Sequence, residues 1–87
     1  MQLPPNEGWV VYMLVCKDKT LYTGITNCFL DRFNKHNAGL GARYTRGRLP
    51  VRLVYFELAK NKSDALKREY AIKQLSRGEK LKLAETT

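Results

Sequence analysis

The sequence predicts an α+β fold, a three-stranded antiparallel sheet flanked by helices, in the chain order β-β-α-β-α-α. Three features of the sequence predict this fold: strand-like runs, helix-like segments and one short turn. Strand-like runs rich in β-branched and aromatic residues occupy residues 9–16, 20–26 and 51–58. Helix-like segments with capping residues and apolar spacing occupy residues 27–38, 64–75 and 76–84. The turn between the first two strands is short enough to close a hairpin, and 87 residues leave room for one domain only.

The first strand, residues 9–16, is apolar at both alternating sets of positions, which is typical of a strand covered on both faces. We therefore place it at the centre of the sheet. If the turn that follows has three residues, Leu14 faces Tyr22 and Tyr12 faces Gly24 in the hairpin. Opposed residues of an antiparallel pair point to the same side. Tyr12 and Tyr22 are therefore expected to share one face, with Gly24 leaving an open patch beside Tyr12.

The first helix is expected to start from a Thr26 or Asn27 cap and to end before Gly39. With about 100° of rotation per residue, its buried stripe comprises Phe29, Leu30 and Phe33. Arg32 and His36 lie one turn apart along an edge of that stripe, so they should border the sheet. Taken singly, Arg32 also suits a surface ion pair and His36 a partner of the helix dipole.

The second half of the chain begins with a glycine-rich and arginine-rich loop, residues 40–50, which has room for one helical turn. After the third strand, Ser63 is expected to cap the helix over residues 64–75. The predicted buried side of this helix comprises Ala65, Leu66, Tyr70 and Ile72. Glu69 and Lys73 fall between these residues, and a carboxylate so placed is costly unless it is paired or metal-bound. Glu69 is therefore either an ion-pair partner of Lys73 or a metal ligand.

The last helix has a clear start signal. Residues 76–79, Ser-Arg-Gly-Glu, have the S-x-x-E form of a capping box. The sequence therefore predicts a final short helix that ends near residue 84.

Basic residues outnumber acidic ones by 16 to 8, and the pI is about 9.8. Six of the basic residues and no acidic residue lie between Arg32 and Arg52. Such clustering is typical of a protein that binds a polyanion, and it favours nucleic acid over a basic surface without a partner. A membrane-surface helix would need an apolar face among these cations, which this segment lacks. The expected contact residues in the segment are Lys35, Arg43, Tyr44, Thr45, Arg46 and Arg48.

The ends of the chain and its cysteines narrow the class of protein further. Residues 1–8 are expected to be a flexible lead, residues 9–84 the domain, and residues 85–87 a tail. The longest apolar run is far shorter than the ~20 residues of a membrane-spanning helix, and no signal-peptide pattern precedes it. We therefore expect a cytoplasmic protein with no membrane contact. Cys16 and Cys28 are isolated and are expected to be reduced thiols in apolar sites.

Five positions in order resemble one family. Val10-Val11-Tyr12 matches a GIY element and Tyr22-Thr23-Gly24 a YIG element, and the two tyrosines are ten positions apart. Arg32 and His36 follow in the first helix and Glu69 in a later one. Over residues 8–83 the chain resembles a GIY-YIG nuclease domain, and specifically the small single-domain bacterial members that are regarded as endonucleases. The resemblance implies the same sheet-and-helix fold.

The resemblance also implies hydrolysis of a phosphodiester with one divalent cation, Mg²⁺ or Mn²⁺. Glu69 would be the metal ligand, because a hard cation takes oxygen ligands and keeps several waters. Arg32 would hold the phosphate and offset its developing charge. Tyr12 or Tyr22 would position the attacking water and take its proton, which requires that nearby cations favour the ionised phenol. His36 would act as a proton carrier.

Two further residues complete the expected nucleic-acid contacts. Gly24 would admit the substrate backbone where a side chain would block it, and Lys73 would lie beside Glu69. The implied substrate is DNA, in a branched, damaged or single-stranded form. The larger nucleases of the family carry a separate DNA-binding domain, so here target choice is expected to come from the basic segment, an oligomer or a partner protein.

The sequence departs from the family pattern at one consequential point. Many members carry an asparagine after the glutamate, whereas none follows Glu69. Either Gln74 or Ser76 takes over its hydrogen bonds, or efficient cleavage is lost. The alternative function is therefore a nucleic-acid-binding module of the same fold with weak or absent catalysis. A third possibility is an interaction protein whose basic surface only ensures solubility.

Overall fold

The computed structural model of the protein describes residues 3–85 and contains three strands and four helices in this range. In chain order they are β1 (Trp9–Val15), β2 (Leu21–Thr26), α1 (Phe29–Asn37), α2 (Arg43–Arg46), β3 (Arg52–Ala59), α3 (Lys62–Lys73) and α4 (Arg77–Ala84). The sheet is antiparallel with the order β2-β1-β3. The predicted fold class and the central position of the first strand are confirmed. The one helical turn allowed for in the basic loop is α2.

The hairpin has the predicted register. Tyr12 pairs with Gly24 and Leu14 with Tyr22. The backbone N–H of Cys16 donates to the carbonyl of Thr20 at 2.9 Å, which closes a three-residue turn. Lys19 in this turn has φ of 71°, the left-handed conformation that lets a three-residue hairpin loop rejoin its strand.

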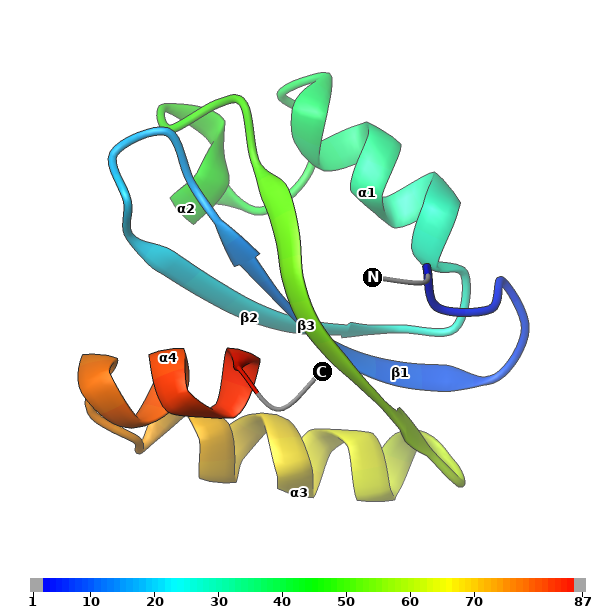
Figure 1. The fold of residues 1–87 in the computed structure, drawn as a ribbon. Coiled ribbons are helices and arrows are strands. Elements are labelled where there is room, and N and C mark those ends of the chain that lie inside the picture. Colours follow the sequence, from blue (N-terminus) through cyan, green and yellow to red (C-terminus); the bar gives the residue numbers. More distant parts are fainter. Residues whose placement is uncertain (1–2, 86–87) are drawn as a thin grey trace.

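The sheet separates two layers of helices. Figure 1 shows α1 and α2 on one side of it and α3 and α4 on the other. Alternate residues of β1 point to opposite faces of the sheet. Tyr12 packs with Phe29 of α1, whereas Met13 packs with Ala65 and Ile72 of α3. All five side chains are almost completely buried. Because β2 is an edge strand, its outer side borders both layers.

The starts of α1 and α3 differ from the predicted caps. Cys28 is the N-cap residue of α1 and makes no side-chain cap, since a thiol is a weak acceptor. The hydroxyl of Thr26, one of the two predicted caps, accepts instead from the Cys28 N–H at 3.1 Å. The N–H of Leu30 is capped from outside the helix by Asn6 Oδ1 at 2.8 Å. The cap of α3 is Asn61, whose side chain accepts from Asp64 N–H at 2.8 Å, so Ser63 lies inside the helix. The capping box that opens α4 is confirmed.

Some residues of the predicted apolar stripes are exposed. Leu66 and Tyr70 lie on the outer side of α3, 46% and 69% exposed, and Leu30 is also exposed. The buried side of α3 instead follows Ala65, Glu69 and Ile72, since a small residue at the contact lets the helix approach β1 closely. Cys28 is exposed as well, so the prediction that it occupies an apolar site is wrong. Glu69 thus faces the sheet more directly than the apolar residues beside it.

The described part of the lead is attached to the domain. Pro4 is buried, and Asn6 bonds to α1 as given above. Residues 1, 2, 86 and 87, parts of the expected flexible lead and tail, lie outside the described residues. Within residues 3–85, no helix is long and apolar enough to cross a membrane.

Candidate active site

A chain of hydrogen bonds joins β1, α1 and α2 in the interior. The Thr45 hydroxyl donates to the Ala42 carbonyl at 3.0 Å, so its oxygen accepts from His36 Nδ1–H at 2.9 Å. His36 Nε2 is then unprotonated and accepts from the Tyr12 hydroxyl at 3.0 Å. This assignment follows from the direction of the bonds in the network. Tyr12 is therefore fixed by a neutral histidine that is fully buried.

The Arg32 guanidinium lies against the phenols of both candidate tyrosines. Contact with Tyr12, and more weakly with Tyr22, raises the pKa of Arg32. The two tyrosine rings are 6.3 Å apart, and the Tyr22 ring lies 5.2 Å from the His36 ring. Strand register and helix spacing thus bring together the four residues Tyr12, Tyr22, Arg32 and His36, as predicted.

The environment keeps both buried partners neutral. Burial, reinforced by Tyr22, raises the pKa of Tyr12 well above its usual value, and Arg32 only partly offsets this. Burial and the neighbouring Arg32 lower the pKa of His36 to about 4. Arg32 alone therefore does not ionise Tyr12, and an ionised phenol in the presence of the metal ion stays a prediction. At neutral pH His36 serves as a hydrogen-bond acceptor.

Two glycines fit tightly around this cluster. A Cβ at Gly24 would lie 2.7 Å from the Tyr12 hydroxyl and 3.0 Å from the Tyr22 ring. The expected open patch beside Tyr12 is thus filled by the Tyr12 hydroxyl itself, and that expectation is wrong. A Cβ at Gly41 would lie 2.5 Å from His36 Nδ1. Gly41 was missed by the sequence analysis, because nothing in a loop sequence shows that it packs on a distant histidine.

Glu69 approaches the same cluster from the opposite layer. Its side chain is 19% exposed, and its carboxylate is close enough to contribute to the raised pKa of Tyr12. Glu69 Oε2 also lies 3.2 Å from Lys73 Nζ, so the expected helical ion pair is present. The carboxylate therefore acts on the Tyr12 phenol through its charge while it is partly neutralised by Lys73.

The donor set fits one type of metal ion. Within residues 3–85, no three His, Cys, Asp or Glu side chains gather closely enough to hold a metal by themselves. A zinc site or a calcium cage of protein ligands does not fit this arrangement. Mg²⁺ or Mn²⁺ does, because such an ion keeps several waters and combines one carboxylate with substrate phosphates. Glu69 is the residue that could hold it.

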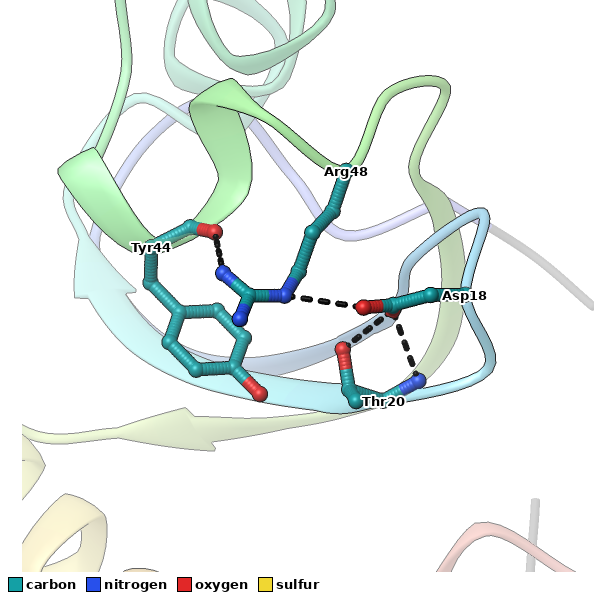
Figure 2. A network of polar contacts seen from close by, with 4 residues as sticks. All are labelled: Asp18, Thr20, Tyr44 and Arg48. Carbon is teal, nitrogen blue, oxygen red and sulfur yellow. Dashed lines mark hydrogen bonds and ion pairs between the residues drawn. The ribbon is translucent and has the colours of Figure 1, made fainter.

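Two residues of the basic segment are engaged within the protein. The Arg48 Nε donates to Asp18 Oδ2 at 2.9 Å, and Nη1 donates to the Tyr44 carbonyl at 2.7 Å (Figure 2). Its guanidinium also lies 4.2 Å from the centre of the Tyr44 ring. Arg48 thus fixes α2 to the hairpin turn, and direct contact with DNA stays a prediction. Thr45 is fully buried against His36, so the prediction that it contacts nucleic acid is wrong.

The other predicted contact residues lie at the surface. Arg43 and Arg46 are exposed on α2, and Tyr44 is 40% exposed with its ring stacked 6.0 Å from that of Tyr22. Lys35 is exposed and pairs with Asp31 at 3.3 Å. The contact between Tyr44 and Tyr22 places α2, which carries Arg43 and Arg46, beside the tyrosine pair.

The two substitutes considered for the family asparagine are not equivalent. The Ser76 hydroxyl accepts from Glu79 N–H in the capping box of α4, so it is already engaged. Gln74 is exposed at the C-terminal cap of α3.

Comparisons with known proteins agree with this architecture. Residues 8–82 match the family model described as the GIY-YIG catalytic domain, so the chain belongs to this nuclease family. The chain is 59% identical to the UPF0213 protein CPE1444 of Clostridium perfringens over 73 residues, 84% of this chain and 78% of that protein. It is 51% identical to the UPF0213 protein OB0043 of Oceanobacillus iheyensis over 80 residues, 92% and 93% of the two chains. The solution NMR structure of the UPF0213 protein BH0048 from Bacillus halodurans is similar to it, with a TM-score of 0.59, 44% identity, and coverage of 91% of this chain and 84% of that one.

Proposed function

We propose that the protein is an endonuclease that hydrolyses phosphodiester bonds in DNA with Mg²⁺ or Mn²⁺. One observation carries this proposal: the phenols of Tyr12 and Tyr22, the guanidinium of Arg32 and the carboxylate of Glu69 converge at the edge of the sheet. They come from β1, β2, α1 and α3. A structural core would not need a guanidinium against both phenols together with a carboxylate whose charge acts on Tyr12.

In this proposal, each side chain of the cluster acts on the scissile phosphate or on water. Arg32 binds the phosphate and stabilises the charge that develops in the transition state. A divalent cation held by Glu69 supplies charge neutralisation and a more acidic water. Tyr22 orients the attacking water, since it is less buried than Tyr12. Tyr12, whose hydrogen is donated to His36, presents its oxygen toward Arg32.

The basic surface supports nucleic acid as the substrate. Arg43 and Arg46 lie on α2 beside the cluster, Lys35 is exposed on α1, and all three are suited to phosphate contacts that carry no sequence information. We propose that branched, damaged or single-stranded DNA is preferred, and that an oligomer or a partner protein directs the enzyme to it.

A second candidate is a DNA-binding module without efficient cleavage. The contact between Glu69 and Lys73 at 3.2 Å favours it, because a lysine that pairs with the proposed metal ligand competes with a divalent cation. The absence of the family asparagine points the same way. This module would bind DNA in a salt-dependent manner and release no product.

The experiment that separates these functions uses a panel of duplex, branched and single-stranded DNA and RNA, with Mg²⁺, with Mn²⁺ and with a chelator. The proposal expects a product that requires the cation, and the preferred panel member identifies the substrate form. Binding to the panel without product in any cation would favour the second candidate. The absence of binding at low salt would reject both.

A further inference from the structure

A separate recess lies beside the proposed active site, between the start of β2, α2 and α4. It has a volume of about 220 Å³ and is lined by Thr20, Leu21, Tyr44, Arg77 and Lys80. No acidic side chain lines it. Within residues 3–85, Arg77 and Lys80 form no ion pair, whereas Arg48 and Lys73 do. The recess therefore presents two uncompensated cations and a phenol to one small volume.

We propose that this recess is a second phosphate-binding subsite for the DNA strand whose scissile phosphate lies at Arg32. Arg77 and Lys80 supply the charge, and the Tyr44 hydroxyl donates a hydrogen bond to a phosphate oxygen. This inference rests on the proposed function, and it adds α4 to the surface that contacts DNA.

The position of the recess matches a continuous strand. Leu21 lines it, and Gly24 lies at the tyrosine cluster three residues further along β2, which corresponds to about 10 Å. That span equals a few nucleotides, since one strand of B-DNA advances about 3.4 Å per nucleotide. The Tyr44 ring lines the recess and lies 6.0 Å from the Tyr22 ring, so it connects the two sites. A strand that runs along the β2 edge reaches both.

The carboxylates nearest to the recess are held by other partners and do not line it. Figure 2 shows that Asp18 is engaged: one oxygen accepts from Thr20 and the other from Arg48. The same Arg48 lies over the Tyr44 ring and fixes α2, which leaves the Tyr44 hydroxyl directed toward the start of β2. On α4, Glu79 accepts from the Ser76 N–H at 2.9 Å in the capping box. Both acidic groups therefore serve the scaffold.

The test compares two double variants that each remove two positive charges. Arg77→Ala with Lys80→Ala changes the recess, and Lys60→Ala with Lys67→Ala is the matched control on exposed sites near and on α3. Binding of a fluorescein-labelled single-stranded oligonucleotide is measured by anisotropy at several NaCl concentrations in a chelator, which prevents cleavage. We expect the recess variant to bind about tenfold more weakly at low salt. We also expect the slope of log K against log salt to fall by about 0.7, the value for one phosphate contact on a single strand.

Equal losses in the two double variants would overturn the subsite, because the effect would then be one of net charge. Cleavage with Mg²⁺ is measured in parallel, so that the two proposals are judged separately. If only the recess variant loses binding and the wild type does not cleave DNA, the result supports the subsite and contradicts the nuclease function. Cleavage by the wild type together with equal binding of both variants supports the nuclease and overturns the subsite.

Discussion

The substitution Gly24→Ala tests whether Tyr12 occupies the space beside this glycine. The added Cβ would lie 2.7 Å from the Tyr12 hydroxyl oxygen and 2.8 Å from Cζ, distances that folded proteins do not accept. Tyr12 cannot move aside freely, because it is 1% exposed, bonds to His36 at 3.0 Å and packs edge-on against Phe29. The clash must therefore be relieved by a shift of the strand or by rotation of Tyr12.

Either response has a measurable cost. Overpacking a filled site costs about 1–3 kcal/mol, and rotation of Tyr12 leaves the buried His36 Nε2 without its donor, which costs about 1–3 kcal/mol. Replacement of a strand glycine by alanine returns roughly 0.5–1 kcal/mol. After this gain is subtracted, we expect Gly24→Ala to lower the free energy of unfolding by about 1 kcal/mol. With a urea slope of about 1 kcal/mol/M for a chain of this size, the unfolding midpoint falls by about 1 M.

The assay is urea unfolding followed by circular dichroism and by the fluorescence of Trp9. Gly78→Ala in α4 is the control, since nothing lies within 4 Å of a Cβ there. This control should raise the free energy of unfolding by about 0.5–1 kcal/mol. If Gly24→Ala is as stable as the wild type or more stable, the space beside Gly24 is open and the described packing of Tyr12 is incorrect.

Three further predictions concern the same cluster. The pKa of His36 is lowered in the folded state, so the stability that neutral His36 contributes is present above its unfolded pKa. This stability is lost as the pH falls from about 6.5 toward about 4. The loss, up to about 3 kcal/mol, should be smaller in His36→Gln when urea midpoints are compared across this pH range. Gly41→Ala should lower stability by about 1–3 kcal/mol, because its Cβ would meet His36 Nδ1 at 2.5 Å; an unchanged midpoint would contradict the contact. Lys73→Gln should lower the Mg²⁺ concentration for half-maximal cleavage by up to about fivefold, since an ion pair at the surface contributes about 0.2–1 kcal/mol. If the variant needs a higher Mg²⁺ concentration than the wild type, Lys73 assists the site and does not compete with the cation.

The hairpin and its tyrosines were predictable because local rules determine them. Alternation with period two sets which residues share a face, and a three-residue turn sets the register, so the pairing of Tyr12 with Gly24 follows from the sequence. The helical spacing likewise placed Arg32 and His36 next to each other in α1. In each case the information lies within about ten residues of the chain.

Other features depend on contacts between distant segments. The side of α3 that faces the sheet is set by the packing of Ala65 against β1. A helical wheel instead predicts that the apolar Leu66 and Tyr70 are buried, whereas both are exposed. The burial of Thr45 follows from its bond to His36, nine residues earlier, which no periodic pattern reveals. The sequence also indicated room at Gly24, whereas only coordinates show that the Tyr12 hydroxyl fills it.

The central claim is that one carboxylate, one guanidinium and two phenols form a site that cleaves DNA. The most direct measurement is the single-turnover cleavage rate, with the protein in excess over DNA and with saturating Mg²⁺, of the wild type and of Glu69→Gln. We expect a rate at least 100-fold lower for Glu69→Gln, the scale expected when a charge-stabilising group is removed, with unchanged DNA binding in a chelator. Equal rates for the two proteins would show that Glu69 does not hold the cation and would contradict the proposed site.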